Sequence, residues 1–186
     1  MNENRIESKS LWNEAARSGL VLGGVSVAYM LLTFPLGKLQ EAGGGLSALG
    51  NVLGIALWVA KLIICIRLMK FFMQKFAEGN EGITNNGTFH FGTATALLSA
   101  LIFSAFSLAW VLFIQPDMYA ESFEVAKDAY SSMLSSEQLD SLDELVPKMP
   151  TFTFFINLVW CWLFGTVLSA IFSRNIPPRN PFADNV

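Results

Sequence analysis

The chain has 186 residues, of which 53% are hydrophobic and only 15% are charged, and its mean hydropathy is +0.45. A soluble domain of this size could not bury so much apolar surface, because soluble domains are about 25% charged. The composition therefore indicates an integral membrane protein. Since a spanning helix needs about 20 apolar residues, four spans and their connections fill nearly the whole chain and leave no room for a separate catalytic domain.

Four apolar runs are long enough to cross a bilayer as helices, so the sequence predicts an all-α integral membrane protein with four transmembrane helices. Pro35 is expected to end the first run, and Pro116 the third. The whole chain, residues 1–186, then forms a single membrane domain. The predicted spans are residues 18–36, 46–66, 91–115 and 151–172.

Lys and Arg are distributed unevenly among the segments that these spans separate. Because Lys and Arg close to a span resist translocation, the segments that carry most of them are expected to be cytoplasmic. This places the N-terminal segment (1–17) and the tail (173–186) in the cytoplasm, and the tail, which is rich in proline, is expected to be extended. The residues that set this orientation are Arg5, Lys9, Arg17, Arg67, Lys70, Lys75, Arg174 and Arg179.

The loop between the third and fourth spans, residues 116–150, is acidic and is therefore predicted to be extracytoplasmic. It is also predicted to be helical. Ser135 and Gln138 have the spacing of a capping box, and apolar residues then recur at helical spacing to form one stripe. The acidic residues are Asp117, Glu121, Glu124, Asp128, Glu137, Asp140, Asp143 and Glu144, and the stripe is Leu139, Leu142, Leu145 and Val146.

Small residues at helical spacing predict where the helices pack. In lipid, apolar surface gives little drive for helix association, so close approach of backbones through small residues matters more. The expected contact is within one four-helix bundle; the alternative is an interface with a second copy or with another membrane protein. The glycines concerned are Gly19, Gly23, Gly50, Gly54, Gly92 and Gly165.

Lys61 is the one ionisable residue inside a predicted span. A lysine in hydrocarbon costs about 2.5 to 3.5 kcal/mol on insertion scales, so it is a candidate functional residue by default. One interpretation is that Lys61 reaches the cytoplasmic headgroups beside Arg67 and Lys70. The other is a buried lysine that binds an anionic lipid headgroup or a carboxylate of a partner.

His90, the only histidine, is expected to be an ordinary interfacial residue, with headgroup contact or pH sensing as the alternative.

No catalytic residue, metal site, cofactor or nucleic-acid partner is predicted. His90 has no Cys or carboxylate at ligand spacing, and phosphate-binding, dinucleotide-binding, metalloprotease and hydrolase motifs are absent from the sequence. Cys65 and Cys161 lie in apolar runs and are expected to be small fillers without a disulfide. Trp160 and Trp162 are expected to be ordinary lipid-facing or core residues.

Several features together resemble a known family. They are a basic N-terminus before a glycine-rich first span, the string from Thr88 to Gly92 at the end of a short loop, the turn at 135–138 in the acidic loop, and Gly165 in the last span. Over about residues 12–174 the sequence resembles the uncharacterised bacterial membrane family called domain of unknown function 4199. The resemblance implies a four-helix protein of the bacterial inner (cytoplasmic) membrane, with no assigned activity and no established catalytic residues to carry over.

Two functional hypotheses follow. The first is a non-enzymatic accessory or scaffold subunit of an inner-membrane complex, in contact with membrane lipids and with a membrane protein partner or a second copy. The alternative is a small transporter or lipid-handling protein that binds anionic headgroups through Lys61 and the basic cytoplasmic rim. An enzyme comes third, because membrane enzymes normally place two or more titratable residues at one depth.

Overall fold

The computed structural model describes residues 8–41, 44–80, 82–130 and 135–176. Within these residues the chain is all-helical, and four helices are long and apolar enough to cross a membrane, as predicted. The spanning candidates are α1 (Ser8–Glu41), α2 (Gly44–Gly79), α3 (Asn85–Phe113) and α6 (Met149–Phe172). Between α3 and α6 lie α4 (Met118–Tyr130), α5 (Ser136–Leu145) and the short 3₁₀ helix η1 (Val146–Lys148).

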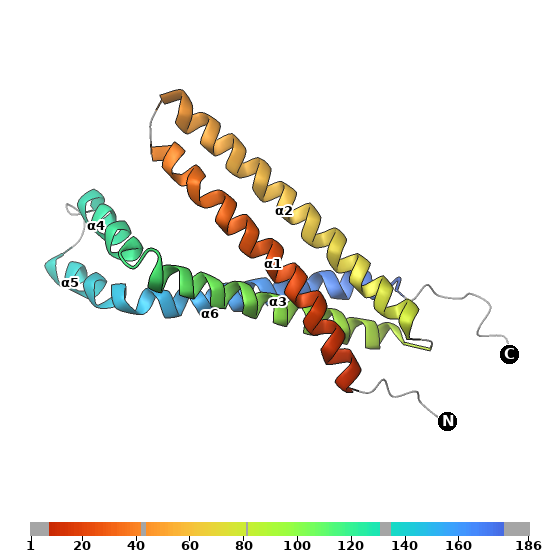
Figure 1. The fold of residues 1–186 in the computed structure, drawn as a ribbon. Helices are drawn as coiled ribbons and strands as arrows, with labels where there is room; N and C mark the ends of the chain where they lie inside the picture. Colours follow the sequence, from red (N-terminus) through yellow and green to blue (C-terminus); the bar gives the residue numbers. More distant parts are fainter. Residues whose placement is uncertain (1–7, 42–43, 81, 131–134, 177–186) are drawn as a thin grey trace.

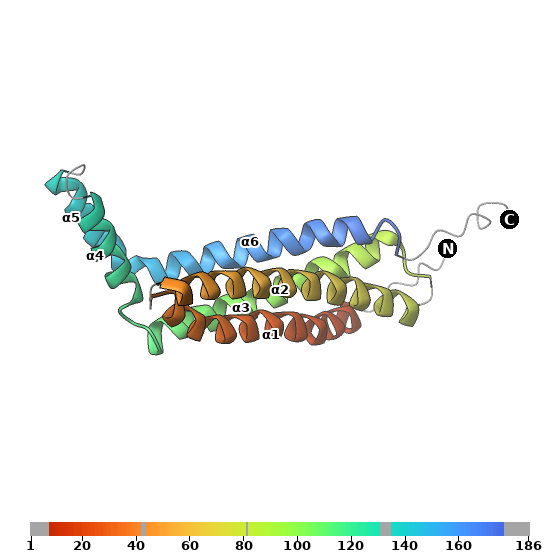
Figure 2. The same ribbon diagram turned by 90° about the horizontal axis from the view of Figure 1, so that it is seen from above.

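The four long helices form an elongated bundle in which the α1 and α2 pair crosses the α3 and α6 pair obliquely (Figure 1). The start of α1 and the end of α6 lie at one end of this bundle, and α4 and α5 project from the other (Figure 2). Helix α3 packs extensively against α1 and α6, and α1 packs against α2, whereas α2 touches α6 in few places. The bundle therefore opens between α2 and α6.

The close contacts along α3 are made by small residues. A Cβ atom added at Gly19 of α1 would lie 2.9 Å from Leu98 Cβ, and one added at Gly23 would lie 3.0 Å from Ile102 Cβ. On the other side of α3, Gly92 faces Ser169 and Gly165 faces Ala96. These four glycines thus pack helices within one chain, where a larger residue would hold the backbones apart. In α2, Gly50 is buried and Gly54 is half-buried.

Two of the helices extend well beyond the predicted spans. The prediction that Pro35 ends the first helix is wrong, because Pro35 lies inside α1. A helix that stopped in hydrocarbon would leave several backbone groups without partners, whereas continuing past the proline leaves out only one hydrogen bond. Residues 8–17, expected to be a separate segment, are the first turns of α1, and Ala15 is fully buried there.

The longest extension is the C-terminal part of α2, which continues beyond residue 66 to Gly79. Its apolar side chains pack with the start of α3 and with Ile83 and Ile176 into a buried cluster, which we name the basic-end cap. At its centre the rings of Phe76 and Phe91 stack with centroids 3.9 Å apart. The cap consists of Met69, Met73, Phe76, Ile83, Phe91 and Ile176.

At the opposite end, α4 and α5 are joined by an ion pair. Lys127 Nζ lies 2.6 Å from Asp143 Oδ1 and 2.8 Å from Glu124 Oε1. Hydrogen bonds to Asp143 and then to Glu124 raise the pKa of Lys127 above its usual range, because they stabilise the charged amine. The predicted capping box is present at the start of α5, where Ser135 accepts from the backbone of Gln138.

Some sequence predictions fall on parts of the chain outside the described residues. These are the chain before residue 8 and the tail after residue 176, together with the side chains of Leu139 and Leu142 in the predicted apolar stripe. Within the described part of the tail, Ile176 is buried in the basic-end cap.

We predict that Gly92→Ala destabilises the bundle by about 1 to 3 kcal/mol, as overpacking does in well-packed interiors. The added Cβ would lie 2.9 Å from Ser169 Cβ and 3.1 Å from Met73 Sδ. The matched control is Gly24→Ala, because an added Cβ at Gly24 meets nothing within 4 Å. Equilibrium unfolding by sodium dodecyl sulfate in mixed micelles measures both variants, and equal stability of the two would contradict this account of the packing.

We also predict that Phe76→Ala lowers the free energy of unfolding by about 3 to 5 kcal/mol, the range for removing a buried aromatic ring. Phe76 is 1% exposed, whereas Phe71 on the same helix is 53% exposed. Phe71→Ala, measured by the same unfolding titration, is therefore expected to cost much less. A small effect of both substitutions would show that the basic-end cap is not a packed core.

Candidate functional site

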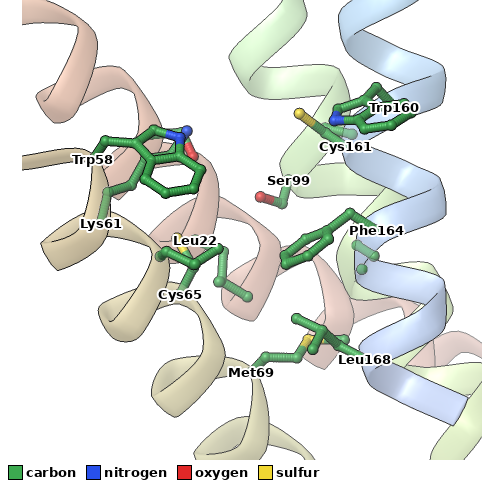
Figure 3. Close-up of a pocket in the computed structure, with 15 residues that line it drawn as sticks. Leu22, Trp58, Lys61, Cys65, Met69, Ser99, Trp160, Cys161, Phe164 and Leu168 are labelled. Carbon is green, nitrogen blue, oxygen red and sulfur yellow. The ribbon is translucent and has the colours of Figure 1, made fainter. Parts of the chain in front are cut away.

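The main candidate site is a cleft of about 400 Å³ between α2 and α6. We name it the α2–α6 cleft. Figure 3 shows side chains of α2 and α6 facing each other across the gap, with Ser99 of α3 behind them. Its lining is mostly apolar, with one charged group, Lys61. The walls are Trp58, Lys61, Leu62, Cys65 and Met69 of α2 and Trp160, Cys161, Phe164, Gly165 and Leu168 of α6, and the floor is Leu22 and Ser26 of α1 and Ala96, Ser99 and Ala100 of α3.

The cleft follows from the choice of residues on its floor. Ser26, Ala96, Ser99 and Ala100 are too short to reach across the space that the separation of α2 and α6 leaves open. The same small residues allow α1 and α3 to approach closely, since the backbone of Ser99 lies against Gly23. The small residues therefore account both for the close packing of α1 against α3 and for the unfilled space between α2 and α6.

Lys61 points into this bundle. Its Nζ lies 5.0 Å from the ring centroid of Tyr29 on α1 and 5.1 Å from that of Phe103 on α3. Side chains on a helix lean towards the helix N-terminus. Because α2 runs towards the basic end, Lys61 leans away from Arg67 and Lys70. The Lys61 amine therefore faces the rings of Tyr29 and Phe103 and leans away from the basic end.

The ammonium group lies deep in the predicted hydrocarbon region. Along the helix axes, Tyr29 is about 18 Å from Arg17, and Phe103 is about 20 Å from His90. Arg17 and His90 are exposed and mark the basic end of the bundle. Since the hydrocarbon core is about 30 Å thick, Lys61 Nζ lies near its middle.

Nothing in the described part of the chain neutralises this charge, because no carboxylate there forms an ion pair with Lys61. The two aromatic rings attract the half-buried ammonium with about 0.5 to 1 kcal/mol each, which together is less than the roughly 2.5 to 3.5 kcal/mol that a lysine costs in hydrocarbon. Cys65 and Cys161 are free thiols in the cleft. Among the described residues, no three His, Cys, Asp or Glu side chains lie together as metal ligands would.

Of the four residues predicted to contact lipid or a partner, only Lys61 lines the cleft. Arg67 and Lys70 are exposed on α2, and His90 is exposed at the start of α3. Sequence reasoning missed most of the other wall residues, including Trp58 and Trp160. The available signal is their spacing, because the wall residues recur three and four positions apart on both helices.

Comparison with known protein families assigns the chain to one of them. A family model described as "Protein of unknown function (DUF4199)" matches residues 17–174. The chain belongs to the DUF4199 family. This confirms the family resemblance seen in the sequence, and the matched DUF4199 region contains every residue that lines the cleft. No match was found among curated proteins or among solved structures.

We predict that Lys61→Leu in this DUF4199 protein raises the free energy of unfolding by about 1 to 2 kcal/mol, because it removes a half-buried charge whose cost in hydrocarbon the two rings only partly offset. Arg67→Leu serves as the control, since it removes an exposed charge and is expected to change stability by less than about 0.5 kcal/mol. Thermal unfolding in a neutral detergent compares the two. Equal effects would mean that Lys61 reaches water.

Proposed function

We propose that this DUF4199 protein is a lipid-handling membrane protein that binds an anionic amphiphile in the α2–α6 cleft, with Lys61 as the counter-ion. The observation that carries the proposal is an ammonium group near the middle of the bundle with aromatic rings, and no carboxylate of the described chain, beside it. An anion in the cleft would supply the missing charge.

The shape and surface of the cleft support this function. An apolar pocket with a small number of polar groups is typical of small-molecule sites, and volumes of about 300 to 1,000 Å³ are usual. Trp58 is 54% exposed and Trp160 is 74% exposed, so the rim of the cleft faces the surroundings of the bundle. In a bilayer those surroundings are lipid, which allows a chain to enter sideways between α2 and α6.

The proposal includes a bacterial inner membrane and an orientation with the basic end in the cytoplasm. The exposed cations at that end include Arg67, Lys70 and Lys75 on α2, whereas α4 and α5 at the other end are acidic. Lys and Arg near the ends of spans are retained on the cytoplasmic side. The α4 and α5 helices then lie outside the cytoplasm, and the cleft opens towards the bilayer between them and the basic-end cap.

A role as an accessory subunit is the second candidate. Four of the six glycines that could have formed an interface with another protein pack helices within the chain, which weakens this role; they are Gly19, Gly23, Gly92 and Gly165. A different observation favours it, because Val125 is 71% exposed and Tyr130 is 56% exposed on α4, beyond the spanning helices. Val125→Ser is expected to reduce any crosslink to a partner in native membranes. A protein that is a free monomer in such crosslinking has no accessory role.

The test of the proposed function is lipid content after purification. We expect the wild-type protein, extracted in mild detergent, to retain an anionic amphiphile and Lys61→Leu to lose at least about 90% of it, since a lost ion pair of 1.4 kcal/mol or more is a tenfold change in affinity. Lys70→Leu removes the same charge from the exposed face and should retain the amphiphile. Mass spectrometry of the extracts measures all three.

Equal retention by the wild type and by Lys61→Leu would refute the proposed function. A loss shared by Lys61→Leu and Lys70→Leu would also count against it, because it would show that general surface charge holds the lipid.

A further inference from the structure

The size of the cleft and the depth of Lys61 together narrow the chemistry of the ligand. We infer that the α2–α6 cleft takes a single-chain carboxylic acid, with its carboxylate on Lys61 Nζ and its hydrocarbon chain along the apolar walls. This inference rests on the proposed function and names the ligand class. It distinguishes a fatty acid from the anionic phospholipids that form the bulk of anionic lipid in a membrane.

The volume of the cleft is sufficient for one acyl chain. The cleft holds about 400 Å³. A methylene group is close in size to a water molecule, whose share of liquid volume is about 30 Å³, so the cleft has room for at least a dozen such groups. One acyl chain of ordinary length therefore fits along its walls.

The depth of Lys61 favours a carboxylic acid over a phosphodiester. A phospholipid headgroup stays in the interface, because its phosphodiester remains ionised and an ion in hydrocarbon is very costly. Lys61 Nζ lies about 15 to 20 Å below the basic end, beyond the reach of a headgroup that stays there. A carboxylic acid differs, since its ordinary pKa is near 4 to 5 and burial raises it, so the acid can enter lipid in its neutral form.

The carboxyl group then releases its proton to water, and the resulting carboxylate pairs with the Lys61 ammonium. The rings of Tyr29 and Phe103 lie 5.0 Å and 5.1 Å from Nζ, and Lys61 itself lines the cleft. A carboxylate in the cleft would give the ammonium the counter-ion that these rings do not provide.

The wall residues suit one extended chain. Leu62, Met69 and Leu168 are flexible apolar side chains on either side of the gap. Figure 3 shows Met69 and Leu168 on opposite walls, further along the cleft from Lys61 than Cys65 is. A chain anchored at Lys61 can run between these walls. Burial of each methylene contributes little to affinity when the alternative is lipid, so the ion pair decides which amphiphile is retained.

The experiment uses the full chain in nanodiscs of phosphatidylcholine, which is neutral overall. The probes are myristate, the alcohol with the same chain, lysophosphatidylglycerol with one chain and a phosphodiester, and diacyl phosphatidylglycerol. Native mass spectrometry counts the bound molecules for the wild type, Lys61→Leu, Lys61→Arg and Lys70→Leu. We expect one myristate per chain, binding at least tenfold weaker to Lys61→Leu, and binding within about tenfold of wild type to Lys61→Arg and Lys70→Leu.

The other outcomes separate this inference from the proposed function. Binding of either phosphatidylglycerol that depends on Lys61, without binding of myristate, overturns the inference and leaves the proposed function standing. Equal binding of myristate and the alcohol overturns the inference, because the carboxylate would then be irrelevant. If no probe depends on Lys61, both fail. If Lys61 is needed to hold a membrane protein carboxylate and no probe binds, the occupant is a partner helix and both proposals are refuted.

Discussion

Close backbone contact along α3 is the constraint on which the rest of the structure depends. Gly19 and Gly23 bring α1 against one side of α3, and Gly165 brings α6 against another. Helix α2 then packs on α1 and remains apart from α6. The space between α2 and α6, and the isolation of Lys61 within it, follow from the way in which α3 holds its two neighbours.

Two kinds of packing stabilise the chain at different depths. In the part expected to lie in lipid, contact between helices depends on small residues, because lipid is as apolar as the side chains that leave it. Beyond Arg67, where charged residues interrupt the apolar sequence of α2, larger side chains form a buried cluster around Phe76 and Phe91. The basic-end cap thus holds the ends of α2 and α3 together, whereas small residues make the close contacts in the middle of the bundle.

The sequence predicted the features that depend on local pattern and missed those that depend on packing. Four long apolar helices, four of the six predicted packing glycines and the capping box at Ser135 were visible as apolar runs and spacings. The end of α2 was missed because Met69, Met73 and Phe76 alternate with charges, so the segment is amphipathic and falls outside a hydropathy criterion. The direction of Lys61 depends on which aromatic rings surround it, and residues 29 and 103 are far from it in the chain.

The central claim is that Lys61 Nζ lies inside the bundle, and solid-state NMR in lipid bilayers tests it most directly. Lysine side-chain nitrogens are labelled with ¹⁵N and tyrosine rings with ¹³C, and the Lys61 signal is identified as the one that Lys61→Leu removes. The account predicts a dipolar contact between this nitrogen and the Tyr29 ring, whose centroid is 5.0 Å away, and none to lipid ³¹P. A contact to ³¹P without one to the Tyr29 ring would contradict it.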